Sequence, residues 1–230
     1  MATEDDVNQN KPYLTKKAQN LKMKSLKMQT AEMTIRPNYF NLTERKGIKM
    51  DNNLVKPRHI DGCVGLSALA PYHSSLFFEW LNNPRIFKGM GDFDSNPFGF
   101  QDSEKYVNVH LKDTWLIVFK KQAKWIPVGY TGLFVRQRHR VGILRYAIGN
   151  QSYEKMWITT KAVNLMIKWA FNDLDLVCIH ASVISLNNGS IRVLEKSGFS
   201  HVGKYQKARF ESGKRYDELL FELVKEMIMI

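Results

Sequence analysis

The residues best suited to chemistry lie in the last third of the sequence. His180 alternates with Cys178 and Ser182, so on a strand these three side chains would share one face. An imidazole can accept a proton near neutral pH, and a half-buried structural histidine is the alternative interpretation. Tyr205 could act as an acid, but core packing explains a tyrosine there equally well.

Polar residues also mark the start of a short helix that Gly198 would end. Asn187 or Asn188, together with Ser190, can accept hydrogen bonds from the first backbone N–H groups of that helix. The same side chains have the donors and acceptors needed to hold a ligand. Capping and catalysis therefore both remain open for these positions.

The cysteines predict neither a disulfide scaffold nor a metal site. Only Cys63 and Cys178 are present, far apart and without further Cys or His at metal-ligand spacing. We expect two reduced, buried thiols.

The charge is strongly basic and unevenly distributed. The 230 residues carry a net charge of +12, which favours nucleic acid, a ribonucleoprotein or a phosphate-bearing cofactor as a partner. Residues 1–58 hold twelve basic and six acidic residues, a net of +6, and are predicted to form a basic N-terminal extension. Its helical spacing of apolar residues permits an amphipathic helix, so it is either a disordered tail or an arm ordered by a partner.

No targeting signal or membrane span is predicted. No apolar run approaches the roughly 20 residues that cross a bilayer, and the acidic first residues match neither a secretory signal nor a transit peptide. The default compartment is the cytoplasm, with the mitochondrion as the alternative.

Residues 59–230 show the alternating strand and helix patterns of one α/β domain. Thr159 is the expected N-cap of the longest helix, and Asp102 or Ser103 that of an earlier one. The predicted strands are 63–69, 115–119, 126–135, 141–148, 177–184, 199–210 and 218–224. The predicted helices are 74–81, 102–111, one from 159 onward, and 188–197, with a loop at 88–100.

Three motifs accompany this order. Residues 187–199 read Asn-Asn-Gly-Ser-Ile-Arg-Val-Leu-Glu-Lys-Ser-Gly-Phe, residues 213–217 read Gly-Lys-Arg-Tyr-Asp, and residues 79–84 read Glu-Trp-Leu-Asn-Asn-Pro. Together they resemble the Gcn5-related N-acetyltransferase (GNAT) superfamily, most closely the branch of the ribosomal-protein N-terminal acetyltransferases. The first motif is similar to the family's Asn-x-x-Ser-x-x-x-x-Glu-Lys-x-Gly-Phe segment. The resemblance covers about residues 59–227.

The resemblance implies a mixed, mostly antiparallel central sheet with flanking helices, splayed at a cleft that takes acetyl-CoA as co-substrate. A primary amine would attack the thioester directly, with Ser190 near the sulfur. The proton would go to His180, Tyr205 or a water path. The implied cofactor-binding residues are Ala147, Ile148, Gly149, Lys155, Thr159, Thr160 and Asn187.

One segment departs from the family pattern. The pyrophosphate turn of the family reads Gln/Arg-x-x-Gly-x-Gly/Ala, whereas residues 153–160 contain no glycine. A phosphate must come close to the backbone there, so the Trp157 indole would fill its space and the Glu154 carboxylate would repel it. The hydroxyls of Thr159 and Thr160 would compensate in part.

Two functions follow. The first is an N-acetyltransferase that acts on a primary amine, such as a protein N-terminus. The alternative is a catalytically inactive protein of the same fold, a structural or RNA-binding subunit of a ribonucleoprotein such as a ribosome. Arg136, Arg138 and Arg140 at a predicted hairpin tip could grip RNA phosphates, although a solvated turn explains them as well.

Overall fold

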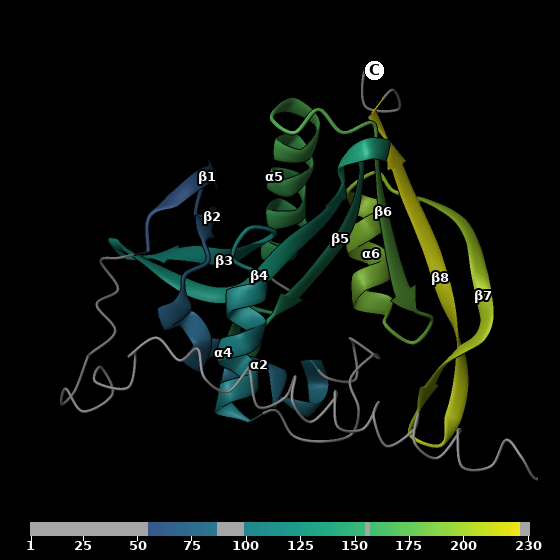
Figure 1. Cartoon of the computed structure of the whole chain (residues 1–230), viewed down its shortest axis with the longest axis horizontal. Helices are drawn as coiled ribbons and strands as arrows, with labels where there is room; N and C mark the ends of the chain where they lie inside the picture. The colour runs from purple at the N-terminus through teal and green to yellow at the C-terminus, as the bar shows by residue number, and fades with distance from the viewer. Residues whose placement is uncertain (1–54, 87–98, 155–156, 226–230) are drawn as a thin grey trace, which may run out of the picture. The chain divides into compact units, whose positions relative to one another are not determined.

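An eight-stranded sheet forms the centre of the described part of the chain (Figure 1). The computed structural model describes residues 55–86, 99–154 and 157–225. The strand order is β1-β2-β3-β4-β5-β6-β8-β7, and only β5 and β6 run parallel. The mixed, mostly antiparallel sheet predicted from the sequence is confirmed. The strands are β1 (Pro57–Asp61), β2 (Val64–Ala68), β3 (Thr114–Lys121), β4 (Lys124–Arg136), β5 (Val141–Ile148), β6 (Cys178–Ile184), β7 (Ser200–Glu211) and β8 (Lys214–Val224).

The sheet begins with a hairpin where a single strand was expected. The predicted strand at 63–69 is β2, and β1 precedes it through a turn at Gly62 with a φ of +63°. Glycine adopts this left-handed conformation without a steric penalty, which explains the tight reversal. The predicted amphipathic helix of the basic extension lies outside the described residues, as do Lys155 and most of the predicted loop at 88–100.

Four α-helices that are described from end to end flank the strands. They are α2 (Ser74–Leu81), α4 (Phe100–Val109), α5 (Ile158–Asn172) and α6 (Asn188–Lys196), and α2 has the predicted bounds. The predicted N-caps of α4 and α5 are wrong, because each helix begins earlier than expected. Gly99 is the N-cap of α4, and the Asp102 carboxylate accepts a hydrogen bond from its N–H at 2.9 Å. Trp157 replaces Thr159 as the N-cap of α5.

Apolar side chains pack on both faces of the sheet. On β3, Ile117 packs in the cluster that contains α5, while its neighbours Leu116 and Val118 pack with α2 and α4. Successive residues of a strand point to opposite faces, so α5 covers one face and α2 with α4 cover the other. We call these the α5 face and the α2–α4 face. Among the described helices, none is both long and apolar enough to cross a membrane.

Candidate active site

Strands β5 and β6 separate part-way along their length. They are in register only from Val141 opposite Cys178 to Ile143 opposite His180, and 144–148 have no register partner on β6. All of β5 stays paired with β4, so the gap opens only on the β6 side. The splay predicted for this pair of strands is present.

Backbone groups of β5 line this gap. The N–H of Gly149 donates to the carbonyl of Val128 on β4 at 2.9 Å. Contrary to the expectation from the sequence, it is therefore not free to bind a thioester carbonyl. Because hydrogen-bonding direction alternates along a strand, the N–H groups of Ile148 and Tyr146 point toward the gap. The carbonyl of Ile148 agrees with this, since it accepts from Arg85 Nη2 rather than from β4.

Gly149 follows β5 at a position where a side chain would not fit. A Cβ on Gly149 would collide with the indole ring of Trp80 on α2. The glycine therefore lets α2 pack directly on the end of β5, at the open end of the gap.

The first backbone N–H groups of an α-helix have no acceptor within the helix. At the start of α5, the side chain of the N-cap residue Trp157 does not cap them, as far as the described residues show. Trp157 has a φ of +20°, which is rare for residues other than glycine. The turn thus has a positive φ although the sequence has no glycine there. Thr159 and Thr160 lie half-buried in the first turn of the helix.

The Trp157 side chain is held on one side of this turn. Its indole is 51% exposed, and Lys161 Nζ lies 4.9 Å from the ring centroid. The same ammonium group donates to Asp61 at the end of β1, at 2.8 Å. The ring is therefore turned toward the β1–β2 hairpin.

The carboxylate of Glu154 has a counter-ion. It forms an ion pair with Arg85, and both side chains are partly buried. Burial also lowers the pKa of the Arg85 guanidinium, which remains charged. Arg85 therefore offsets the negative charge that was expected to repel a phosphate at this turn.

The start of α6 is tied to β5 across the gap. The Asn187 side-chain oxygen accepts a hydrogen bond from the Ser190 N–H at 3.0 Å, so its predicted capping role is confirmed. The Tyr146 hydroxyl donates to the Ser190 carbonyl at 3.1 Å, and burial raises the pKa of Tyr146. Tyr146 thus remains a neutral donor that positions Asn187 and Ser190 beside the gap.

The three side chains predicted for catalysis are not brought together. His180 lies on the α2–α4 face, because its neighbours Ile179 and Ala181 pack on the α5 face. Ser190 lies on α6, whose Leu194 packs in that same cluster with α5. Tyr205 is 60% exposed on β7, at the edge of the sheet.

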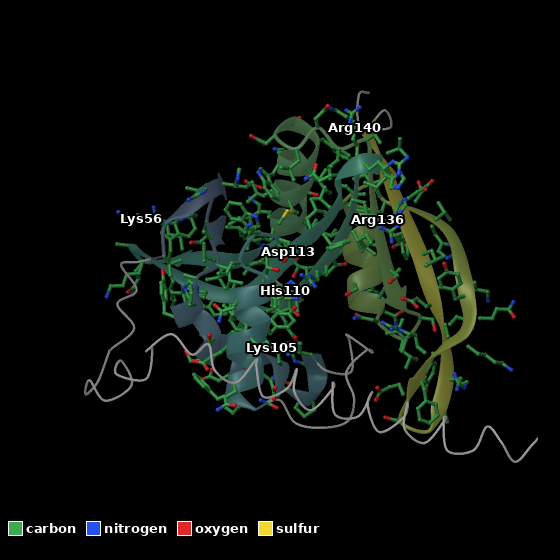
Figure 2. All side chains as sticks on the ribbon, in the orientation of Figure 1. Lys56, Lys105, His110, Asp113, Arg136 and Arg140 are labelled. Atoms are coloured by element: carbon green, nitrogen blue, oxygen red, sulfur yellow. The ribbon has the colours of Figure 1, made fainter. Side chains whose placement is uncertain are left out.

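The sequence pattern missed a polar network on the α2–α4 face. Arg145 Nη2 on β5 lies 2.7 Å from His110 Nδ1 and 3.0 Å from Asp113 Oδ1. His110 Nδ1 is 3.0 Å from the same carboxylate oxygen, and Figure 2 shows the His110 and Asp113 side chains next to each other. The i, i+3 spacing of His110 and Asp113 at the end of a helix was the available signal.

Comparison with known proteins identifies the fold. A family model for an acetyltransferase (GNAT) domain matches residues 64–200, which is more than half of the chain. This chain belongs to the GNAT acetyltransferase family. The match includes β5, α5, β6 and α6, the elements that surround the gap.

Relatives of known sequence or structure agree with this assignment. A probable N-acetyltransferase of Bacillus subtilis, YjcK, is 36% identical over 78 residues, which are 33% of this chain and 42% of that protein. The chain therefore matches less than half the length of this relative. A spermidine N-acetyltransferase from Vibrio cholerae, in complex with CoA and spermine, has a TM-score of 0.64 at 19% identity, covering 73% of this chain and 98% of that one. A ribosomal-protein-S5-alanine acetyltransferase from Vibrio fischeri has a TM-score of 0.61 at 18% identity, covering 73% and 96%.

The residues of this GNAT domain fit an acyl-CoA. The α5 N-terminus offers backbone donors suited to a pyrophosphate, and Trp157 has a positive φ in the turn before it. The two obstructions expected from the sequence are reduced, because the indole lies against Lys161 and Glu154 is paired with Arg85. The Asn187 amide nitrogen is not used by the cap, so it remains available as a donor.

Proposed function

We propose that this protein transfers an acetyl group from acetyl-CoA to a primary amine, with a protein N-terminus as the first acceptor to test. The observation that carries the proposal is the gap between β5 and β6, bordered by the start of α5 and the start of α6. In a GNAT domain, this gap supports the proposal because a thioester would lie between the two strands there. Acetyl-CoA would supply an activated acetyl group.

Each side of the gap has a separate role in this proposal. The N–H groups of Ile148 and Tyr146 would hold the acetyl carbonyl oxygen, replacing the Gly149 N–H of the sequence-based expectation. The backbone at the start of α5, with Thr159 and Thr160, would hold the pyrophosphate. Asn187 would donate to the pantetheine, and the Ser190 hydroxyl would face the departing sulfur.

The amine would enter from the α2–α4 face, because α5 and α6 occupy the other side of the gap. This face is open to water at His180, which is exposed. We propose that the ammonium proton leaves through that water, and that His180 and Tyr205 would be reached only through it. The His110–Asp113–Arg145 network on the same face would help to orient the acceptor.

Calorimetric titration of the full chain with acetyl-CoA tests the proposal first. We expect one site with a micromolar dissociation constant. Mass spectrometry of peptides with free N-termini, incubated with protein and acetyl-CoA, should then show addition of an acetyl group. N-terminally blocked peptides of the same sequence are the matched control. A folded chain that does not bind acetyl-CoA would refute this function.

The RNA-binding alternative has one specific observation in its favour. Arg136, Arg138 and Arg140 are exposed around the connection between β4 and β5, where Figure 2 labels Arg136 and Arg140. Arg140 is engaged in an ion pair with Asp175, which leaves Arg136 and Arg138 as the pair to substitute. Under this alternative, changing both to Ala should weaken RNA binding and flatten its salt dependence. Unchanged affinity and salt slope would remove this cluster from any RNA role.

A further inference from the structure

We propose that Cys178, His180 and Glu222 form a binding site for one divalent transition-metal ion, of which Zn²⁺ fits the ligands best. The site would lie on the α2–α4 face, across β6 and β8. It is separate from the groups proposed to hold acetyl-CoA. The proposal does not depend on acetyl transfer.

Strand geometry brings these three residues together. Cys178 and His180 are two residues apart on β6, so their side chains leave the same face of the sheet. Glu222 on β8 is directly opposite His180 in an antiparallel pair, which places it on that face as well. The sulfur, an imidazole nitrogen and a carboxylate oxygen all lie within 4.8 Å of one another.

These distances suit a tetrahedral ion after a small adjustment. With metal–ligand bonds of about 2.0–2.3 Å, ligand atoms of a tetrahedral zinc site lie roughly 3.3–3.8 Å apart. Side-chain rotation would have to bring the ligand atoms closer together by at most about 1.5 Å. Cys178 and Glu222 are only half-buried and His180 is exposed, so neighbouring atoms do not prevent this movement.

The surroundings leave the donor atoms of His180 and Glu222 available, while the Cys178 side chain has a hydrogen bond with the Leu223 backbone. Within the described residues, the side chains of His180 and Glu222 form no hydrogen bond or ion pair with other residues. Their register neighbours are Val141 and Ile143 on β5, Val224 on β8 and Ser200 on β7, none of which carries a charge. No cationic neighbour in the register therefore competes for the Glu222 carboxylate.

The donor set selects the type of metal. One thiolate, one imidazole and one carboxylate suit Zn²⁺ and its neighbours in the transition series, whereas Mg²⁺ and Ca²⁺ prefer oxygen ligands alone. Three protein ligands leave a fourth position for water, which an exposed face supplies. Burial and the nearby Glu222 carboxylate raise the pKa of the Cys178 thiol, and a bound cation would reverse that effect. A metal-bound His180 would no longer accept a proton, but the water path for acetyl transfer would remain.

The test is a metal titration of the full chain after removal of metals with a chelator. With Co²⁺ as the probe, we expect one equivalent to bind, with thiolate-to-metal absorption in the near ultraviolet and tetrahedral bands in the visible. Zn²⁺ should displace the Co²⁺ and abolish both signals. Cys178→Ser should remove the thiolate absorption, and Glu222→Gln, which keeps the side-chain size, should weaken Zn²⁺ binding by more than about tenfold.

Two variants serve as matched controls. Cys63→Ser changes the other cysteine, and His139→Ala changes an exposed histidine on the β4–β5 connection. Both should bind Co²⁺ and Zn²⁺ like the natural chain, and Zn²⁺ should raise their Tm but not that of Cys178→Ser. The proposal is wrong if the natural chain shows no one-to-one binding, or if Cys178→Ser binds Zn²⁺ as well as the natural chain does.

Discussion

Replacing Trp157 with glycine tests whether the turn before α5 can receive a phosphate. The change acts on the backbone and on the side chain. A φ of +20° costs a non-glycine residue about 1–2 kcal/mol, and glycine removes that cost. Against this, the contact between Lys161 and the indole is lost, worth about 0.5–1 kcal/mol, and the unfolded chain gains entropy worth about 0.5–1 kcal/mol.

These effects nearly cancel, so the variant should fold with a stability within about 1 kcal/mol of the natural chain. Its Tm should then shift by less than about 4 °C. Because the indole is already turned toward the β1–β2 hairpin, we expect the dissociation constant for acetyl-CoA to change by less than about threefold, or ~0.7 kcal/mol.

Calorimetry on three proteins separates the two effects. Trp157→Ala removes the indole but keeps a Cβ in the strained backbone, so a difference between Ala and Gly reports on the backbone alone. The reasoning is refuted if the natural chain does not bind acetyl-CoA and Trp157→Gly binds it at micromolar concentration. That result would mean that the indole blocks the site and that the fold has been kept for another role.

Three further predictions concern Asn187, the Arg85–Glu154 ion pair and His73. Asn187→Ser keeps a cap acceptor, so it should preserve the Tm while weakening acetyl-CoA binding. Asn187→Ala should weaken binding too and should also lower the free energy of unfolding by about 1 kcal/mol, measured by thermal unfolding. If the Ser variant binds acetyl-CoA as well as the natural chain does, Asn187 serves as a cap only. Glu154→Gln should tighten acetyl-CoA binding and Arg85→Met should weaken it, because the arginine balances the charge of the carboxylate. The opposite changes in the dissociation constants measured by calorimetry would contradict this. Burial lowers the pKa of His73 from 6.5 to about 4. Between these pH values the unfolded chain binds a proton at His73 that the folded chain does not bind. The free energy of unfolding should therefore fall as the pH drops through that range. Urea unfolding at pH 7 and pH 5 should show this fall in the natural chain and a smaller one in His73→Gln.

Much of the fold was predictable because its local signals agree. The apolar spacing of Ala162, Met166 and Ala170 gave the buried side of α5, and all three are fully buried. The turn at Gly213 and the end of α6 at Gly198 follow from positive φ angles that glycine accepts. Strand β1 was missed because its residues alternate only between half-buried and exposed, which leaves little apolar contrast in the sequence.

The site was predictable only where its residues are close in sequence. Asn187 and Ser190 belong to one motif, and their hydrogen bond lies within one helical turn. Arg85 and Glu154 come from distant segments, so the sequence showed the negative charge without its counter-ion. The two thiols were expected to be buried, but Cys63 and Cys178 are only half-buried. Likewise Glu222 joins Cys178 only through the β6–β8 register, which no local spacing reveals.

The strand order also bears on the sequence of events in folding. Neighbours from β1 to β5 follow chain order, and β7 and β8 form their own hairpin, so both groups can form from nearby segments. The parallel pairing of β6 with β5 requires the α5 crossover and consists of three register pairs; we call this pairing the β5–β6 join. Long-range, parallel pairing is slow, so we expect this join to form last. Pulse-labelled hydrogen exchange would show late protection there, and early protection would contradict it. A ligand that contacts both β5 and β6 would then stabilise this pairing and slow the unfolding of the whole domain.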